Sequence, residues 1–169
     1  KALYLHKFHP ELRDEVSDMQ MAVFERGTEV GNLARHLFPG GVNASLDLPR
    51  GYQQALKFTA ELIQKDCPVI YEAGFLYDDV ICFVDILVRE KNGWHAYEVK
   101  SSTNLSNIYH LDAALQYYVL KNAGLPVVSF DIVLLNNQYV RNGPLDINSL
   151  FVAHQIMPQV VRLQDLVSS

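Results

Sequence analysis

The sequence predicts an α/β fold of the α+β kind, in which helices flank a mixed sheet, and two observations support this class. Apolar residues recur with helical spacing as far as about residue 65, and with the strand spacing of two from residue 68 onward. Gly, Pro, Asn and Asp separate the periodic segments at turn positions. The chain has 169 residues, of which 49% are hydrophobic. That is enough for one core, so residues 1–169 are expected to form a single domain.

The first part of the chain is expected to be helical. Residues 10–37 carry apolar side chains at helical spacing, and residues 52–65 form a second such segment that ends before Pro68. Residues 38–49 lie between them and contain a Pro-Gly-Gly sequence, which predicts a loop.

Three strands are predicted next, over residues 68–77, 80–90 and 94–100. Asp78-Asp79 and Asn92-Gly93 separate them, and Asn-Gly is the strongest short signal for a hairpin turn. Two successive hairpins are therefore expected.

The last third of the chain predicts a helix over residues 107–123 and a fourth strand over residues 127–136. The sequence LDINSLFVAHQI, residues 145–156, has a mixed pattern and is expected to form a short helix over the sheet edge. The expected order is thus α-α-β-β-β-α-β.

Charge, cysteine content and chain start limit the classes of protein. The net charge of −5 argues against a surface that binds phosphates unaided. Cys67 and Cys82 are isolated, which is typical of reduced thiols in a cytoplasmic protein. No apolar run approaches the roughly 18 residues of a membrane span. The chain begins at Lys1, so we expect a fragment of a longer protein, whose further domains are candidate partners.

The second hairpin brings charged residues to one face of the sheet. With Asn92-Gly93 as the two-residue turn, Leu87 lies opposite Glu98 and Asp85 lies opposite Lys100. Since side chains alternate along a strand, Asp85, Glu98 and Lys100 share one face.

The first hairpin adds a third acid. With Asp78-Asp79 as its turn, Glu72 lies opposite Asp85. Three buried carboxylates repel one another and a single lysine cannot neutralise them, whereas a divalent cation can. Mg²⁺ prefers carboxylate oxygens and water as ligands. The alternative is a surface stripe with a cross-strand pair of Asp85 and Lys100, although apolar Leu87 shares that face and favours an interior site.

Three short sequences resemble one enzyme superfamily. VDIL (84–87), YEVKSS (97–102) and the helical LQYYVL (115–120) resemble the PD-(D/E)XK nuclease superfamily, and its RecB-like group in particular. FERGTEVGNLARHLFPGG (24–41) resembles an uncharacterised bacterial domain family found in the N-terminal part of longer proteins. The resemblance covers most of residues 1–155 and implies a restriction-endonuclease-like core.

The resemblance also implies roles. Asp85 and Glu98 would hold Mg²⁺ or Mn²⁺ together with the main-chain carbonyl of Val99. Lys100 would orient the attacking water or offset charge on the phosphate, and Gln116 would brace the site from the following helix.

Four residues are auxiliary candidates: Glu29, His36, Glu72 and Tyr118. The chain departs from many RecB-like relatives because it lacks their set of cysteines, so an iron–sulfur cluster is not supported. The spacing of Gln116 and Tyr118 also differs from the usual Gln-x-x-x-Tyr pattern.

The function expected from these residues is a Mg²⁺-dependent deoxyribonuclease. Exo- and endonuclease action, and single- and double-stranded DNA, stay open. A second hypothesis is a catalytically inactive nuclease fold that binds nucleic acid or a protein partner. A third is an α/β interaction domain in which the E-x-K triplet is accidental.

Overall fold

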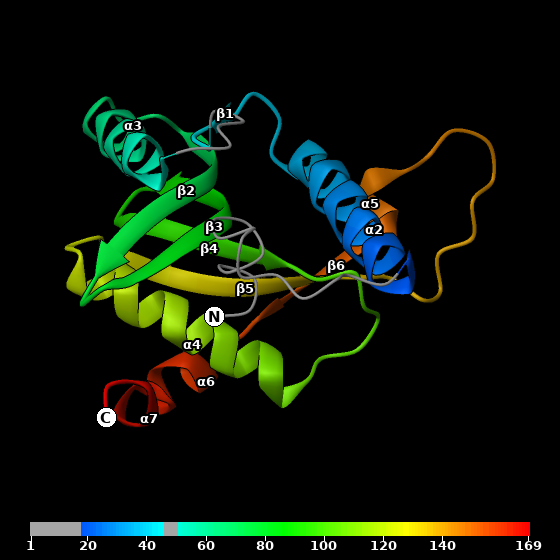
Figure 1. The fold of residues 1–169 in the computed structure, drawn as a ribbon. Helices are drawn as coiled ribbons and strands as arrows, with labels where there is room; N and C mark the ends of the chain where they lie inside the picture. The colour runs from blue at the N-terminus through cyan, green and yellow to red at the C-terminus, as the bar shows by residue number, and fades with distance from the viewer. Residues whose placement is uncertain (1–17, 46–50) are drawn as a thin grey trace.

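The structure is a computed structural model and describes residues 18–45 and 51–169 (Figure 1). Residues 10–17 of the first predicted helix lie outside this range. The first half holds α2 (Asp18–Ala34), the short 3₁₀ helix η2 (Arg35–Leu37), β1 (Val42–Asn43), α3 (Tyr52–Gln64), β2 (Val69–Tyr77), β3 (Val80–Glu90) and β4 (Gly93–Val99). The second half holds α4 (Asn107–Asn122), β5 (Val127–Leu135), α5 (Ile147–Leu150), β6 (Phe151–Gln155), α6 (Met157–Arg162) and α7 (Gln164–Val167).

The strands form one mixed sheet in the order β1-β2-β3-β4-β5-β6. β1 runs parallel to β2 and β4 runs parallel to β5, whereas the other neighbours are antiparallel. Helix α4 makes the crossover between the parallel strands β4 and β5 (Figure 1). The predicted class, a mixed α/β fold with helices flanking the sheet, is confirmed.

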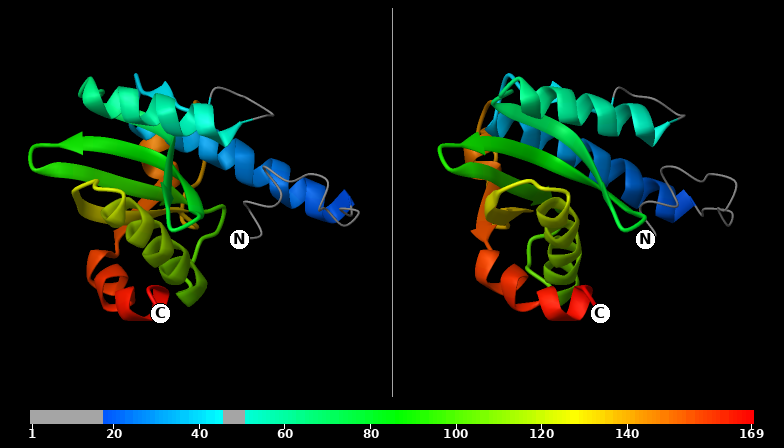
Figure 2. Two further views of the ribbon diagram at one scale, coloured as in Figure 1. Left: turned by 60° about the vertical axis from the view of Figure 1, so that its left-hand side comes forward. Right: turned by 90° about the vertical axis from the view of Figure 1, so that its left-hand side faces the viewer.

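Helices cover both faces of the sheet (Figures 1 and 2). α2 and α3 lie on one side, and α4, α6 and α7 lie on the other. The larger hydrophobic cluster joins the sheet to α3, α4 and α6, and the smaller one joins α2 to the middle of the sheet. In β4 the fully buried Trp94 and Ala96 belong to the larger cluster and Tyr97 to the smaller, as period-two alternation requires.

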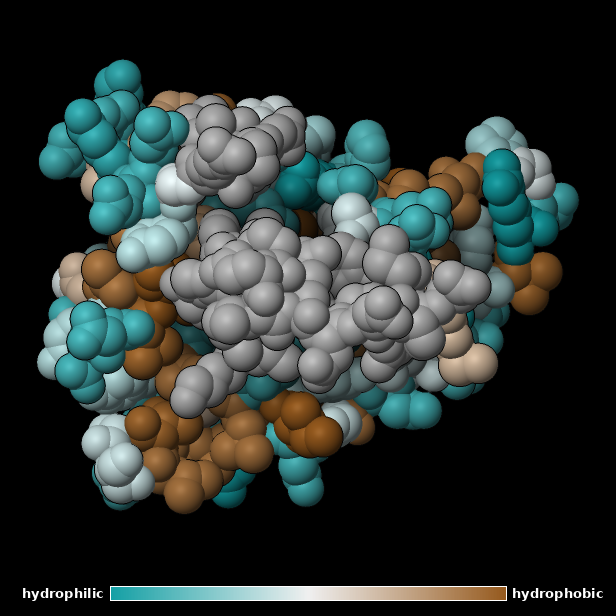
Figure 3. Space-filling model, in the orientation of Figure 1, coloured by the Kyte–Doolittle hydropathy of each residue, from teal (hydrophilic) through white to brown (hydrophobic). Residues whose placement is uncertain are grey.

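Exposed apolar side chains remain on the side of α4, α6 and α7. Figure 3 shows hydrophobic surface along the lower edge of the molecule, where these helices lie. Ile108 and Leu111 of α4 and Leu166 of α7 contribute to the exposed apolar area.

The sequence analysis missed both edge strands. β1 lies within the predicted loop 38–49, and the segment 145–156 forms α5 and then β6 instead of a short helix alone. β1 has two residues, too few for any periodic pattern. Only Phe151 of the five residues in β6 is fully buried, so the alternation of apolar and polar residues is weak there.

The outer edge of β2 is closed by α3 beyond the end of β1. The buried hydroxyl of Thr59 accepts a hydrogen bond from Gly74 N at 2.9 Å and donates to the Ala55 carbonyl at 2.8 Å. β1 pairs only with Ile70 and Tyr71 of β2, so the main chain at Gly74 needs this partner. Helix α3 thereby satisfies the Gly74 N–H, which would pair with β1 if that edge strand were longer.

The first hairpin has the predicted register. Tyr77 lies opposite Val80, and both turn residues, Asp78 and Asp79, have positive φ angles of 50° and 57°. Two such angles define a type I′ turn, whose twist matches that of the flanking strands.

The predicted register of the second hairpin is wrong by two residues. Glu90 pairs with Gly93 and Leu87 pairs with Ala96, so the turn is Lys91-Asn92 and not Asn92-Gly93. The same register places Asp85 across from Glu98, where the prediction had Lys100. Because the shift is even, Leu87, Trp94 and Ala96 still share one face, as predicted. Alternation is broken next to Asp85, since Val84 joins the larger cluster and Ile86 the smaller.

Gly93 explains the shift, since it is required inside the strand. A Cβ atom at Gly93 would lie 2.4 Å from the carbonyl oxygen of Pro126, which is main chain and cannot move aside. Trp94 N donates to the same oxygen at 2.8 Å. The glycine therefore serves the close approach of β4 to the start of β5, and the turn forms one residue earlier than its sequence signal suggests.

We predict that Gly93→Ala destabilises the protein by about 2 kcal/mol or more, because the added methyl group overlaps a main-chain carbonyl. Gly27→Ala is the matched control, because a Cβ at Gly27 in α2 meets nothing within 4 Å. The control should be neutral or stabilising by about 0.5–1 kcal/mol, since alanine favours a helix. Urea unfolding of both variants measures this, and equal stability of Gly93→Ala and wild type would refute the explanation.

Candidate functional site

Asp85 lies in β3 and is held by the main chain of β4. Its Oδ2 atom accepts a hydrogen bond from Val99 N at 2.7 Å. Burial raises the pKa of Asp85 well above its usual value, and the negative charges of Glu98 and Glu72 raise it further. The Val99 N–H and the ammonium of Lys100 act in the opposite direction and are outweighed. Asp85 is therefore a carboxyl group that folding makes harder to ionise.

Glu98 is one of the few buried charged residues, and its side chain holds the site together. Its Oε2 atom accepts from Gln116 Nε2 at 2.8 Å, and its Oε1 atom lies 3.1 Å from Lys100 Nζ. Both carboxylate oxygens thus have a partner, which a buried ionised group requires. One partner comes from α4 and the other from the residue that follows β4.

Lys100 leaves the end of β4 and is fixed at both ends. Its main-chain N donates to the Val133 carbonyl at 2.9 Å, and its Nζ atom lies 3.3 Å from Asp112 Oδ2 as well as close to Glu98. The ammonium also sits 5.3 Å from the centre of the Tyr109 ring. Burial works to lower the pKa of Lys100, but the charges of Glu98 and Asp112 outweigh it and raise the pKa.

Helix α4 supplies three of these contacts from one face. Tyr109, Asp112 and Gln116 are three and four residues apart, which is the spacing of neighbours on a helix surface. The N-cap is Ser106, whose side chain accepts from Ile108 N at 3.2 Å. The register of α4 over the sheet therefore sets the positions of Lys100 and Glu98 together.

Asp112 was missed as a site residue. The sequence analysis did not place it in the site, yet it is the second carboxylate partner of Lys100. Its position four residues before Gln116, on the same helical face, is the signal that could have identified it.

The structure brings together Asp85, Glu98, Val99, Lys100 and Gln116, in the neighbourhood that the sequence predicted. The carboxylates of Asp85 and Glu98 are the side-chain oxygen groups that could contact a cation there, and the main chain of Val99 contacts Asp85 through its N–H. Within residues 18–45 and 51–169, no three His, Cys, Asp or Glu side chains lie close enough together to hold a metal ion. The cluster of three acids expected from the hairpin registers is therefore not present as a ligand set.

Glu72 turns toward η2 instead. Its φ angle is +54° in the middle of β2, and its Oε1 atom lies 3.5 Å from a guanidinium nitrogen of Arg35. Its charge still contributes to the raised pKa of Asp85, so the two carboxyl groups lie near each other. Arg35 was not predicted as part of the site, because η2 has no sequence pattern that indicates where its side chains point.

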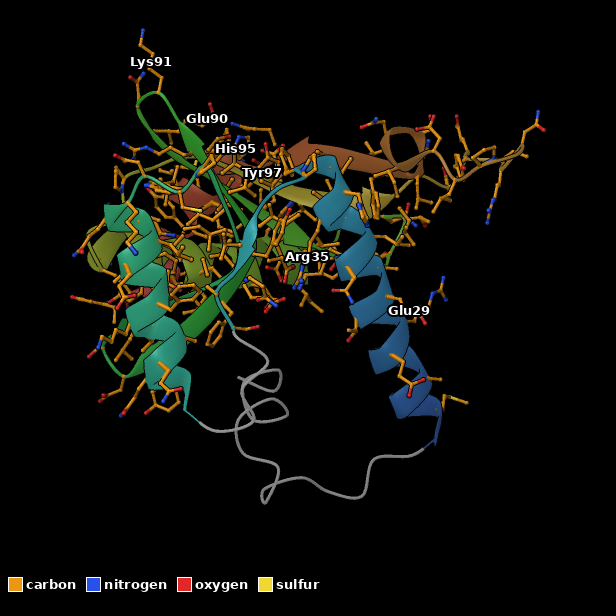
Figure 4. The ribbon with its side chains drawn as sticks, turned by 90° about the horizontal axis from the view of Figure 1, so that it is seen from above. Glu29, Arg35, Glu90, Lys91, His95 and Tyr97 are labelled. Carbon is orange, nitrogen blue, oxygen red and sulfur yellow. The ribbon has the colours of Figure 1, made fainter. Side chains whose placement is uncertain are left out.

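The other auxiliary candidates lie apart from Glu98. Glu29 is exposed on α2 (Figure 4), and His36 is exposed in η2. Tyr118 packs edge-on against Tyr77 with ring centres 5.6 Å apart, near the tip of the first hairpin. No contact joins any of these three residues to Glu98 or Asp85 within the part of the chain that the structure describes.

A second polar cluster lies on the opposite face of β4 (Figure 4). His95 Nε2 lies 2.7 Å from Asp131 Oδ1 in β5, and His95 Nδ1 lies 3.1 Å from the Tyr97 hydroxyl and 3.7 Å from Glu90 Oε1. Burial, with the charges of Asp131 and Glu90, raises the pKa of Tyr97 to about 12. Both ring nitrogens of His95 are engaged by the protein itself, so this cluster ties β4 to β5.

A comparison of the chain with family models, with curated proteins and with solved structures found no match. Among the helices of the described residues, none is long and apolar enough to cross a membrane.

The raised pKa of Asp85 predicts how stability depends on pH. A carboxyl group that ionises less readily in the folded protein lowers stability as pH rises from the unfolded pKa through the folded one. In EDTA, the melting temperature of Asp85→Asn should therefore be above that of wild type at pH 7–8. The difference should be about 2–4 °C for each kcal/mol by which the substitution raises the free energy of unfolding. The gap should close as pH falls toward about 4, the unfolded pKa of Asp.

Melting curves of both proteins across this pH range measure the effect. Asp66→Asn is the control, because Asp66 is highly exposed and its ion pair with Arg89 at 3.5 Å contributes little. A melting temperature of Asp85→Asn below that of wild type at pH 8 in EDTA would contradict the assignment.

Proposed function

We propose that this chain is a metal-dependent nuclease that hydrolyses phosphodiester bonds in DNA. The observation that carries the proposal is the grouping of four side chains across β3, β4 and α4. Gln116 and Lys100 contact Glu98, and Asp85 beside them accepts from Val99 N. These are the residues to which the resemblance to PD-(D/E)XK nucleases assigns roles. The succession β2-β3-β4-α4-β5, with β5 parallel to β4, has the order expected of a restriction-endonuclease-like core.

The oxygen groups suit a magnesium or manganese ion. Mg²⁺ is usually held by one or two carboxylates and completes its shell with water and substrate phosphate oxygens. Asp85 and Glu98 would supply the carboxylates, and the resemblance adds the Val99 carbonyl. A bound ion of this kind supplies a water of lowered pKa as the nucleophile and neutralises phosphate charge. It would also relieve the repulsion between Glu98 and Asp85 that raises the pKa of Asp85.

The chain's own residues have separable tasks. Gln116 holds one oxygen of Glu98, which fixes the orientation of the other, and Val99 N holds Asp85. Lys100 stands beside Glu98 Oε1 as a charged donor, in position to offset charge that grows on a phosphate oxygen. Asp112 holds the ammonium from the other side and limits its movement.

One observation favours a second candidate function, a catalytically inactive module that binds nucleic acid or a protein partner. Both oxygens of Glu98 are satisfied by Gln116 and Lys100 without any cation, and within the described residues no three His, Cys, Asp or Glu side chains could hold a metal ion. Such a group can serve as a structural tie alone.

Lys100→Met separates the two functions. The variant keeps the aliphatic stem and removes a charge whose proposed role lies in the transition state, so turnover should fall by about 100-fold or more. Binding of a DNA oligonucleotide in EDTA at fixed low salt should change by less than about threefold. Lys121→Met, at the exposed end of α4, is the matched control and should keep wild-type turnover.

Cleavage of single- and double-stranded substrates in Mg²⁺ and in Mn²⁺ gives the readout. Full activity of Lys100→Met would refute the assigned role. Absence of cleavage by the wild type with any divalent ion, together with binding that depends on Lys100, would support the inactive module.

Metal binding has its own test. A ligand that binds only the folded state stabilises it, by about 2.7 kcal/mol at a concentration of 100 times its Kd. Mg²⁺ should therefore raise the melting temperature of wild type and raise that of Asp85→Asn much less. Asp66→Asn again serves as the control and should respond as wild type does. An equal response of all three proteins would exclude Asp85 as a ligand.

A further inference from the structure

A pocket of about 370 Å³ lies where η2 passes into the Pro-Gly-Gly turn, on the α2 side of the sheet. Its walls come from Asn32 and His36, from the turn residues Gly40 and Gly41, and from Arg35. The ring of Tyr71 in β2 completes the lining. This region is separate from the face that carries Glu98, because Tyr71 belongs to the cluster that packs on α2.

The lining has the chemistry of an anion site. No carboxylate is among the lining residues, although the chain carries 19 acidic residues and a net charge of −5. Arg35, His36 and Asn32 all offer N–H donors. The side chains of Asn32 and His36 are exposed and make no hydrogen bond to other described residues. Exposed donors of this kind are hydrated in the free protein, and they can exchange that water for the oxygens of an anion.

The turn that shapes the pocket is rigid. The Tyr71 hydroxyl accepts from Gly41 N at 3.1 Å and donates to the Phe38 carbonyl. A Cβ at Gly41 would lie 2.4 Å from the Tyr71 ring, so only glycine permits this contact. Gly40 has a φ of +83° and nothing within 4 Å of the position of a Cβ, which leaves its main chain open.

Arg35 is held in place and still has donors to spare. Its guanidinium lies 5.1 Å from the centre of the Tyr71 ring and 3.5 Å from Glu72 Oε1. A guanidinium carries five N–H donors in a planar fork, so one carboxylate contact leaves several for a second acceptor. Figure 4 shows Arg35 next to the sheet at the end of α2. The residue is therefore preorganised for a phosphate.

One chain of contacts connects the pocket with the candidate site. Glu72 falls across from Asp85, because the flanking pairs are Tyr71 with Ile86 and Ala73 with Val84. The Arg35–Glu72 contact thus connects the pocket wall to the strand position beside Asp85. A polymer with regularly spaced phosphates can contact a protein at more than one place, whereas one small anion cannot.

We infer that this pocket binds a phosphate group of the nucleic-acid strand that is cut at the candidate site, held by Arg35, His36 and Asn32. The inference rests on the proposed function for the identity of the polymer. It assigns to the pocket the positioning of the strand, since a phosphate held there fixes which neighbouring phosphodiester reaches Asp85 and Glu98.

The first arm of the test uses inorganic phosphate and ¹⁵N-labelled protein of residues 1–169. Phosphate should shift the amide signals of Gly40 and Gly41, and this shift should be lost in Arg35→Gln and reduced in His36→Gln. Arg89→Gln is the matched control, because Arg89 also stacks on an aromatic ring, at 5.2 Å from Trp94, and also pairs with an acid at 3.5 Å, but lies outside the pocket.

The second arm measures affinity for a single-stranded DNA oligonucleotide in EDTA, in the Asp85→Asn background, so that no cleavage occurs. Arg35→Gln should weaken binding about tenfold and lower the slope of log K against log salt by about one. His36→Gln leaves the ion pair of Arg35 and Glu72 intact, so it should weaken binding severalfold without disturbing the fold. Arg89→Gln should bind as the background protein does.

Each outcome decides the inference. Unchanged oligonucleotide binding in both Arg35→Gln and His36→Gln overturns it, including the case in which free phosphate still shifts Gly40 and Gly41, since the pocket then takes a free anion only. The two proposals fail separately. If the wild type cleaves nothing but Arg35→Gln weakens oligonucleotide binding, the nuclease is refuted and the pocket is kept. If the protein cleaves DNA and neither Arg35→Gln nor His36→Gln changes that cleavage, the nuclease is kept and the pocket is refuted.

Discussion

The buried carboxylate of Glu98 is the constraint on which the rest of the site depends. An ionised group in this position has to be paired, and its two oxygens take their partners from different elements, Gln116 of α4 and Lys100 after β4. Asp112 then holds Lys100 from α4 a second time. The helix cannot slide over the sheet without breaking these pairs, so the crossover between β4 and β5 is fixed by charge as well as by apolar packing.

β4 organises two polar groups on its two faces, and they behave differently. His95 and Tyr97 face the α2 side and find Asp131 within the sheet, so that cluster is closed by direct contacts. Asp85, across from Glu98, is left with one main-chain hydrogen bond and the repulsion of two carboxylates. Strain of this kind is typical of functional groups, whereas satisfied networks such as that of His95 stabilise the strand. This contrast is why we assign chemistry to one face only.

Much of this arrangement follows from the sequence, and the failures have physical reasons. The period of two and the turn residues placed β2, β3, β4 and β5 within a residue or so, since those strands are long and half-buried. The hairpin register was wrong by two because Gly93 serves a contact with Pro126, a residue 33 positions away that local turn chemistry ignores. A register error of two residues leaves the side chains of β4 on their predicted faces, so Glu98 and Lys100 still lie close to Asp85. The pairing of Glu72 with Arg35 depends on a positive φ and a short 3₁₀ helix, and neither has a local pattern.

The seal that α3 places on the edge of β2 has a consequence for how copies of this chain behave at high concentration. An open strand edge offers donors and acceptors to a neighbouring molecule, and long flat edges of this kind promote sheet growth between molecules. Thr59 occupies the Gly74 N–H, and its own proton goes to Ala55, so nothing at that point is left for a foreign strand to pair with. At the other edge, β6 is short and is followed immediately by α6. The Thr59 hydroxyl thus removes one pairing point from the open edge of β2, and it acts together with the net charge of −5 against association between copies.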